Sequence, residues 1–424
     1  MLPKRRHVLA SGIGMAALGL AGCGLSGSGS GGSDSGSDAA KGEVKGEISF
    51  QTWSLKSEKF TPYFEKLVKD FEAKHPGTKV KWMDQPGDGY QDKILSQANS
   101  QTLPDVINLP PDLAYPLVKG NFLMDLKKAD PSLESTYVSG AVTSYKLTEG
   151  DGIYGFPWYL GTDMNWWNLE GLKPFGVDKN SLPTSMDEVF TLAEKIAKAG
   201  GKTPLISSMP VFTITMKDGK FDFNTDENVK LLERYAQLFQ MGAMPPEVLN
   251  ANFAGNSELY KQGKALWTTS TSSYADKLKT EAPTILSHTA VNPRFPFAPL
   301  FVQGLSVSGK SKNPATALAF AKFATNDENQ IAFCKLAQGF LPGTVKASED
   351  PSKFAEKSDN EVQNEAVKIA SASLKDAKYI TNPRWTNDMN TNLNQQMALA
   401  LKGTQSAKVA LDKAVEYGNK NLQK

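Results

Sequence analysis

The segment between residues 47 and 109 most constrains the fold, because strand-like and helix-like patterns alternate within it. Glu47–Trp53 alternates apolar and polar side chains, as a half-buried strand does. From Phe60 to Phe71 the apolar side chains recur on one helical face, and His75-Pro76-Gly77 ends that helix. The alternation continues with a strand, a helix and a strand at residues 78–83, 90–98 and 105–109. Strands separated by helices require crossovers, so the sequence predicts an α/β fold with a largely parallel sheet.

The later part of the chain continues this alternation. A turn at 150–155 leads into a strand, and further strands are expected at 264–269 and 305–308. The Ser185-Met186-Asp187-Glu188 run is a capping box that opens a helix, and Gly200-Gly201 closes it. Other helices are expected at 226–241, after Asn313-Pro314, from 327 and from 386 onward.

The first 22 residues have the pattern of a signal peptide. Lys4, Arg5 and Arg6 precede a run from Val8 to Gly22 that carries no charge. That run is shorter than the roughly 20 apolar residues that span a bilayer, and glycines dilute it. It ends in Leu20-Ala21-Gly22-Cys23, which resembles the lipobox of bacterial lipoproteins and implies that Cys23 is acylated after cleavage.

Two export routes stay open. Arg5-Arg6 resembles a twin-arginine signal, but a plain basic start would look the same. Residues 23–46 then form a linker in which Gly24–Asp38 contains almost only Gly, Ser and Asp, a composition typical of flexible coil. We therefore expect an exported protein that is lipid-anchored to the outer face of the cell membrane.

Composition and missing motifs exclude several kinds of function. Loss of the signal lowers the formal charge from +2 to −1, because three cations and no acid are removed, and such balance argues against nucleic acid. After acylation of Cys23 only Cys334 remains, so no internal disulfide is expected. His75 and His288 have no metal-ligand spacing. Without a nucleophile motif, a metal site or a cofactor motif, we expect no enzyme, no cofactor and no metal.

The GxGxxG run at 150–155 is not a dinucleotide motif. Phe156-Pro157 follows it directly, so it enters a strand instead of opening a helix.

Aromatic residues fall where loops are expected, and loops at strand ends carry ligand sites in open α/β sheets. For Trp82, Trp166 and Trp167 the favoured interpretation is core packing. For Trp53, Trp158 and Trp385, which adjoin turns and polar neighbours, a ligand site is favoured slightly over core. Asp112, in the loop after the third strand, is an N-cap, a ligand contact or both.

With these residues in view, the chain resembles the carbohydrate-binding, maltose-binding-protein-like solute-binding proteins of bacterial ABC importers. The resemblance covers nearly all of residues 47–424. It is carried by degenerate segments in a fixed order: Phe71–Gly77, Tyr90–Ile94, Leu103–Val106, Tyr154–Pro157, Leu182–Glu188, Gly263–Leu266, Gly304–Asn313, Gly339–Pro342 and Leu401–Gly403. Trp166-Trp167-Asn168 departs from the family's usual Tyr-Asn-Lys-Asp, and the stretch 268–274 lacks its Gly-x-Trp, so the substrate of no single relative transfers.

The resemblance implies a periplasmic-binding-protein-like α/β fold of two lobes joined by a multi-strand hinge, with the ligand cleft between them. Lobe 1 would comprise 47–155 and about 295–345, and lobe 2 would comprise 156–294 and about 346–424. Carried over by position, the ligand contacts of lobe 1 would be Trp53, Ser54, Tyr90 and Asp112. Those of lobe 2 would be Trp158, Tyr159, Phe212, Ser270, Thr271, Tyr274, Arg384 and Trp385.

The expected function is that of a monomeric, lipid-anchored receptor that binds a carbohydrate and delivers it to the membrane permease subunits of an ABC importer. An oligosaccharide is the favoured ligand. The alternatives are a non-sugar solute such as glycerol phosphate, for which Arg384 and Arg294 are the few candidate anion ligands, a surface glycan hydrolase and a structural lipoprotein.

Overall fold

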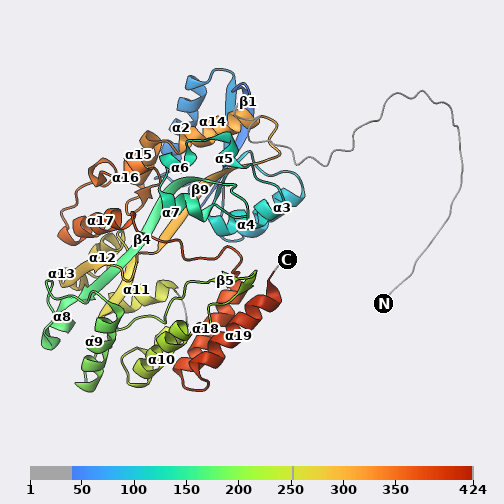
Figure 1. Ribbon diagram of the computed structural model, residues 1–424. Helices are drawn as coiled ribbons and strands as arrows, with labels where there is room; N and C mark the ends of the chain where they lie inside the picture. Colours follow the sequence, from blue (N-terminus) through green and yellow to red (C-terminus); the bar gives the residue numbers. More distant parts are fainter. Residues whose placement is uncertain (1–40, 251–252, 423–424) are drawn as a thin grey trace, which may run out of the picture. The chain divides into compact units, whose positions relative to one another are not determined.

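The computed structural model describes residues 41–250 and 253–422 of the chain (Figure 1). The predicted signal peptide, Cys23 and most of the linker lie outside this part. The described residues form one compact unit. No helix among them combines the length and the apolar character needed to cross a membrane.

The strand–helix alternation predicted for the first segment is confirmed. It consists of β1 (Gly46–Trp53), α2 (Thr61–Lys74), β2 (Thr78–Gln85), α3 (Tyr90–Asn99) and β3 (Val106–Leu109). β1 pairs in parallel with both β2 and β3, so that Phe50 lies opposite Trp82 and Val106. The helix α2 buries Phe64, Leu67 and Phe71, as its periodicity predicts.

The rest of the sheet is antiparallel, so the prediction of a largely parallel sheet is right only for β1–β3. The strands lie in the order β10-β4-β9-β3-β1-β2, where β4 is Phe156–Asn168, β9 is Leu300–Val307 and β10 is Leu341–Pro342. β9 runs antiparallel to both β3 and β4, because it returns from a distant part of the chain in the opposite direction.

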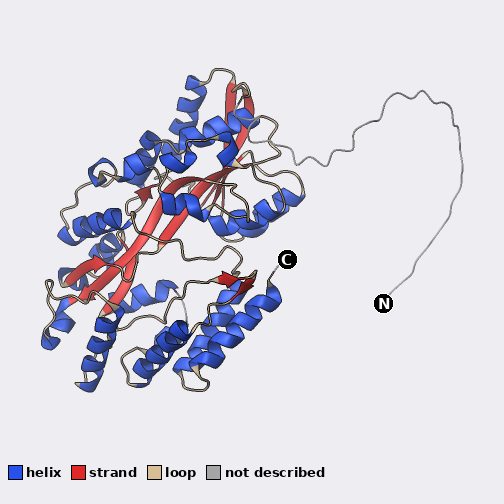
Figure 2. Ribbon diagram, viewed as in Figure 1, coloured by secondary structure: helices blue, strands red, loops and turns tan. Residues whose placement is uncertain are grey.

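β4 is the longest strand of the sheet, and all of its 13 residues are buried (Figure 2). Its first half pairs with β9 and β10, and its second half pairs with β7 (Trp267–Thr271) and β8 (Thr289–Pro293). Trp158 and Tyr159 lie within this strand. The sequence placed them in a loop, and that placement is wrong because the turn at 150–155 ends before Phe156.

Helices surround the sheet. Those between β3 and β4 are α4 (Pro111–Lys119), α5 (Leu126–Ala129), α6 (Leu133–Thr136) and α7 (Ser139–Ser144). Those between β4 and β9 are α8 (Leu169–Leu172), α9 (Met186–Lys198), α10 (Asp226–Gln240), α11 (Phe253–Lys261), α12 (Tyr274–Glu281) and α13 (Pro283–Ser287), with a short hairpin of β5 (Met216–Lys217) and β6 (Lys220–Phe221). The last are α14 (Pro314–Ala324), α15 (Asp327–Leu336), α16 (Val345–Ser348), α17 (Glu361–Ser373), α18 (Asn387–Leu401) and α19 (Ala407–Asn421). Three short 3-10 helices span Lys173–Phe175, Pro246–Asn250 and Pro351–Lys353.

Local signals in the sequence set several helix ends. Ser185 accepts a hydrogen bond from the amide of Glu188 at the start of α9, as the capping box predicts. For α15 the capping residue is Asn326, whose side chain accepts a hydrogen bond from the amide of Asn329. The apolar periodicity of α10 predicts Val229, Leu232, Ala236 and Phe239 on its inward face. Leu232 is buried and Val229 and Phe239 are partly buried, and Tyr235 and Leu238 are buried beside them.

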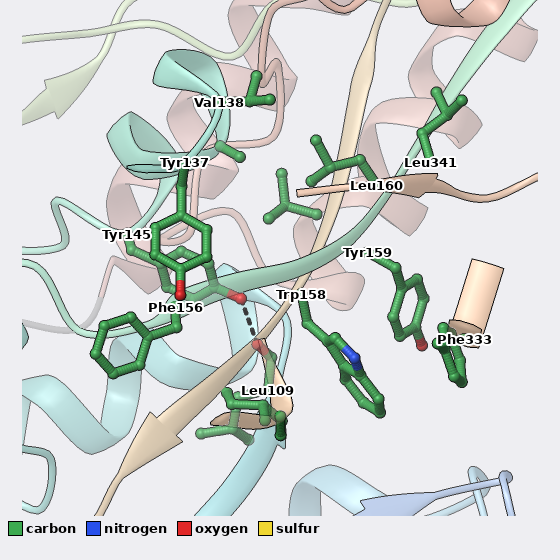
Figure 3. Close-up of a cluster of buried hydrophobic side chains, with 14 of the residues drawn as sticks. Leu109, Tyr137, Val138, Tyr145, Phe156, Trp158, Tyr159, Leu160, Phe333 and Leu341 are labelled. Atoms are coloured by element: carbon green, nitrogen blue, oxygen red, sulfur yellow. Dashed lines mark hydrogen bonds between the residues drawn. The ribbon is translucent and has the colours of Figure 1, made fainter. Parts of the chain in front are cut away.

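Two hydrophobic clusters divide at β4. The first, here called the sheet core, contains Trp158, Phe333 and Trp166, and Figure 3 shows the part around Trp158. The second, the helical core, begins with Trp167 and joins α9, α10, α18 and α19. Consecutive side chains of a strand point to opposite faces, which is why neighbouring tryptophans enter different cores. Trp166 and Trp167 are both fully buried, so the predicted core packing is confirmed for these two residues.

The helices α12 and α17 contribute to the sheet core, although the sequence assigned both to lobe 2. The hydrophobic clusters do not follow the expected lobe boundaries, which stay a prediction. In α15, Cys334 is buried in the same core with 1% of its surface exposed, and burial raises the pKa of its thiol.

Candidate functional site

The carboxyl end of β1 presents Trp53 and Ser54. The Trp53 ring is partly exposed and stacks on Tyr90, with 5.7 Å between ring centroids. Its indole Nε1 is buried and has no hydrogen-bond partner among the described residues. Ser54 is exposed and has a φ of 54°, a conformation that turns the chain sharply away from the strand.

Tyr90 is less available to a ligand than the sequence suggested. It is 3% exposed, and its hydroxyl donates to the backbone oxygen of Asn108 at 3.0 Å. Burial and the charge of Asp84 raise the pKa of Tyr90, so the phenol stays neutral. The role of Tyr90 in this structure is to support the Trp53 ring from below the strand end.

Asp112 is the second residue of α4, directly after the end of β3. Pro110 occupies the N-cap position, so the N-cap role suggested for Asp112 is wrong. The side chain is exposed, yet desolvation by the surrounding protein raises the pKa of its carboxyl. Burial, followed by the charge of Asp112, raises the pKa of Tyr379.

Tyr115 and Arg384 connect the same two segments directly. Arg384 Nε donates to the hydroxyl of Tyr115 at 2.6 Å, and its guanidinium lies 5.8 Å from the Tyr115 ring centroid. The backbone of Arg384 is fixed because its amide donates to Asn382 Oδ1 at 3.0 Å. Arg384 is partly buried, and its Nη1 also contacts the sulfur of Met216 at 3.9 Å. A cation from the turn before α18 is thereby held beside α4, the helix that also carries Asp112.

Trp158 and Trp385 are core residues in this structure, which corrects the placement favoured by the sequence. Trp158 is 0% exposed and packs against Phe64 and Phe333, with 4.8 Å between its ring centroid and that of Phe333 (Figure 3). Trp385 is 9% exposed and packs edge-to-face against Phe221 and Phe223. Neither ring offers a face on which a ligand could stack.

Phe212 and Tyr274 are also buried, at 5% and 4% exposure. Phe212 belongs to the helical core. The Tyr274 hydroxyl donates to the backbone oxygen of Ser257, and its ring packs edge-to-face on Trp166. Tyr159 is 8% exposed, with its ring between Phe333 and Phe340.

Ser270 and Thr271 lie at the carboxyl end of β7 and are partly exposed. They pair with Met164 and Asp163 of β4. The Thr271 hydroxyl shares a hydrogen bond of 2.9 Å with that of Ser273. The predicted hydroxyl-rich stretch therefore ends a strand, at the position where ligands of α/β proteins bind.

The second half of β4 carries a buried polar cluster that the sequence analysis did not assign to the site. Asp163 is 3% exposed, its Oδ1 has no partner among the described residues, and burial raises its pKa to about 6 against the opposing effect of Arg294. Asn165 donates to the oxygen of Pro293 at 2.7 Å and accepts from Trp267 Nε1 at 3.2 Å and Arg294 Nη1 at 3.4 Å. The unusual polarity of Met164-Asn165 within an apolar run was the available signal.

Among the described residues, no three His, Cys, Asp or Glu side chains are grouped so that they could hold a metal ion.

Comparisons with a family model, with related sequences and with solved structures give consistent results. Residues 66–366 match the family model of the bacterial extracellular solute-binding proteins. The sn-glycerol-3-phosphate-binding periplasmic protein UgpB of Brucella melitensis is 26% identical over 335 residues, which cover 72% of this chain and 73% of that protein.

The fold is shared with solved structures of binding proteins. A candidate oligosaccharide periplasmic-binding protein of Synechococcus has a TM-score of 0.77 at 23% identity, covering 88% of this chain and 98% of that one. The GacH receptor of Streptomyces glaucescens, solved unliganded and with acarbose, has a TM-score of 0.67 at 21% identity, covering 90% and 100%. These likenesses confirm the predicted α/β, binding-protein-like fold.

Proposed function

We propose that this chain, which belongs to the bacterial extracellular solute-binding proteins, captures a carbohydrate for the ABC importer that it serves. Members of this family are substrate-binding proteins of ABC importers and not enzymes, in agreement with the absence of catalytic motifs in the sequence. Beyond this family role, we propose the class of ligand and the residues that hold it.

The contact between Tyr115 and Arg384 carries the proposal. It joins α4, at the carboxyl end of β3, to the turn before α18, across 269 positions of sequence. A solute that touches both elements binds more tightly to the arrangement in which α4 and Arg384 are close than to an arrangement in which they are apart. It therefore shifts the population toward the closed arrangement, which is the form that a permease can recognise.

Together with this contact, the accessible side chains of the predicted set suit a hydroxylated, partly apolar ligand. Trp53 offers a partly exposed aromatic face, and Asp112 is an exposed carboxylate that can accept hydrogen bonds from hydroxyl groups. Ser54, Ser270 and Thr271 add accessible hydroxyls. From the predicted set we retain these residues with Arg384 as ligand contacts, and we assign supporting roles to the buried Tyr90, Trp158, Tyr159, Phe212, Tyr274 and Trp385.

The first test is a thermal-shift screen of the purified protein against mono- and oligosaccharides, followed by isothermal titration calorimetry. We expect a sugar to raise the melting temperature. Trp53→Ala and Arg384→Gln should each weaken binding at least about tenfold, which corresponds to about 1.4 kcal/mol. Arg234→Gln is the matched control, because Arg234 of α10 pairs with Glu194 of α9 and takes no part in the Tyr115–Arg384 contact. A protein that responds to no sugar would contradict the proposal.

A phosphoester is the second candidate. Arg384 lies at the contact between the two elements, a guanidinium binds phosphate well, and UgpB of Brucella is a glycerol-phosphate-binding protein. Asp112 lies on the same helix as Tyr115, and its negative charge disfavours an anion at this contact, so we place this ligand second. Including sn-glycerol 3-phosphate in the same screen decides between the two, since binding of that compound without any sugar response would reverse the order.

We also propose that Cys23 anchors the protein to the outer face of the membrane, with residues 24–46 as a tether. The support is the lipobox-like sequence and the extracellular location of the family. Cys23→Ser should move the protein from the membrane fraction to the soluble fraction without changing sugar affinity. If the variant stays with membranes, the anchor assignment is wrong.

A further inference from the structure

A cavity of about 120 Å³ lies where the turn between β7 and α12 meets the segment before β10. Ser272 forms one wall, and its hydroxyl donates to the backbone oxygen of Gly339 at 3.3 Å. The loop before α17, around residues 354–358, and α17 itself close the other sides. One buried water occupies roughly 10–15 Å³ on a comparable measure, so this space admits several waters or one sugar-sized ring.

The walls combine one exposed aromatic ring with buried polar groups. Phe340 lines the cavity and is 42% exposed, which is unusual for a phenyl ring in a folded domain. Gln363 also lines it, is 5% exposed and has an Oε1 without a hydrogen-bond partner among the described residues. An unpaired buried carbonyl costs free energy unless a donor reaches it, so this residue points to an absent hydrogen-bond donor.

The charge of the walls favours a neutral ligand. Asp276 and Glu356 contribute two carboxylates, and Lys357 contributes one ammonium group. An anion would meet net negative charge, whereas hydroxyl groups can donate to the carboxylates and to Gln363 and can accept from the lysine. An apolar face with a few converging polar groups is the usual composition of a small-molecule site.

The cavity adjoins the proposed ligand site at the end of β7, where Ser272 directly follows Ser270 and Thr271. The Phe340 ring packs on that of the buried Tyr159, with 4.9 Å between centroids. Phe301, at 38% exposure, lies near it, because a side chain built at Gly161 would meet both Phe301 and Phe340. Two partly exposed aromatic rings thus lie close together, and one of them lines the cavity.

We propose that the cavity is a subsite for a second sugar ring, stacked on Phe340 and hydrogen-bonded to Gln363 and Asp276. The inference rests on the proposed carbohydrate function and adds that the ligand has more than one ring. A ring held here touches the Gly339–Phe340 segment and the helices α12 and α17 together, so longer sugars bind more tightly than single rings.

The test is calorimetry on the full chain with glucose, maltose, maltotriose and raffinose, for the parent and for Phe340→Ala and Gln363→Leu. Phe340→Ala removes an exposed ring and should leave the melting temperature nearly unchanged. We expect Phe340→Ala to weaken the best trisaccharide at least about tenfold and any monosaccharide less than twofold. Gln363→Leu, which removes the unpaired oxygen at similar volume, should weaken the trisaccharide about fivefold.

Leu399→Ala is the matched control, because Leu399 is exposed to a similar degree, at 39%, and does not line the cavity. Trisaccharide affinity that is unchanged in both cavity variants would overturn the subsite while leaving the carbohydrate function intact. A parent that binds single rings as tightly as trisaccharides would overturn it in the same way. A parent that binds none of the sugars overturns the proposed function and the subsite together.

Discussion

The two halves of β4 have the same burial and opposite chemistry. From Phe156 to Thr162 the strand pairs with β9 and β10, and Trp158 and Leu160 enter the sheet core. From Asp163 to Asn168 it pairs with β7 and β8, and its buried side chains include a carboxylate and an amide. The first half stabilises mainly by excluding water, whereas the second half buries Met164, Trp166 and Trp167 and adds directed hydrogen bonds of buried polar groups.

The difference teaches where this fold can tolerate change. An apolar core accepts another apolar side chain of the same volume, but a buried polar cluster is disrupted by the loss of any one member. The polar half also fixes which strands meet, because Asn165 bonds to β7 and β8 at once. We therefore expect the polar half of β4 to fix the positions of β7 and β8 relative to β4.

Trp158→Ala should have the largest effect on stability. It removes a fully buried indole from contact with Phe64 and Phe333, and such truncations cost about 3–5 kcal/mol. Urea unfolding measures the loss. Trp158→Phe, which keeps an aromatic ring, should cost clearly less. If the alanine variant loses under about 1 kcal/mol, the apolar half does not carry the stability assigned to it.

Asn165→Leu comes next. The change keeps the volume roughly constant but leaves Trp267 Nε1 and Arg294 Nη1 without their acceptor, at a cost of about 2–4 kcal/mol in the free energy of unfolding. Leu160→Met, a volume-conserving change in the apolar half, is the control and should cost under about 1.5 kcal/mol. Equal costs for the two variants would erase the contrast between the halves.

Asp163→Asn should change how stability depends on pH. Below about pH 4 the carboxyl is protonated in the folded and the unfolded chain. Between about pH 4 and 6 the folded chain keeps a proton that the unfolded chain has lost, because burial raises the pKa to about 6. The free energy of unfolding therefore falls as pH rises through this window, by about 2–3 kcal/mol in total.

The measurement is the difference between the unfolding free energies of parent and Asp163→Asn at a series of pH values. It should slope between pH 4 and 6 and be flat above pH 7. Asp359→Asn is the control, since Lys279 lowers the pKa of that exposed carboxylate and its loss leaves the slope from Asp163 in place. A difference that does not vary with pH would mean that folding leaves the pKa of Asp163 unchanged.

The smallest effect is expected at the junction of the halves. Thr162 is 1% exposed, and its hydroxyl donates to the oxygen of Pro299 at 2.7 Å. Thr162→Val removes one buried hydrogen bond and should cost about 1 kcal/mol. Thr162→Ser keeps the hydroxyl and separates the hydrogen bond from the methyl packing. A valine variant that is more stable than the serine variant would show that the junction behaves like the apolar half.

Much of the fold follows from local sequence signals. The periodicity of residues 47–109 predicts β1 to β3 with their helices. In α18 the apolar residues at helical spacing are predicted to face inward, and all are buried: Met389, Leu393, Met397, Ala400 and Leu401. These elements are predictable because each is encoded within a few turns of chain. The direction of β9 is not, because strand direction depends on where the chain re-enters the sheet.

The candidate site could be predicted only in part. Trp53, which ends β1, and Asp112, which follows β3 at the start of α4, are predicted because they lie near strand ends. The burial of Trp158 and Trp385 could not be read from neighbouring polar residues, since it depends on helices that arrive from elsewhere. Tyr115 was missed for the same reason, because its partner Arg384 lies 269 positions away.

The burial of Cys334 has a practical consequence for following this protein in solution. Once Cys23 is replaced, Cys334 is the only thiol left, and it is both inaccessible and protonated. A cysteine introduced at an exposed position such as Val211, which is 60% exposed, would then react alone with a maleimide dye. One fluorophore per molecule can be attached without altering the native core, and its emission can report occupancy directly while solutes are screened.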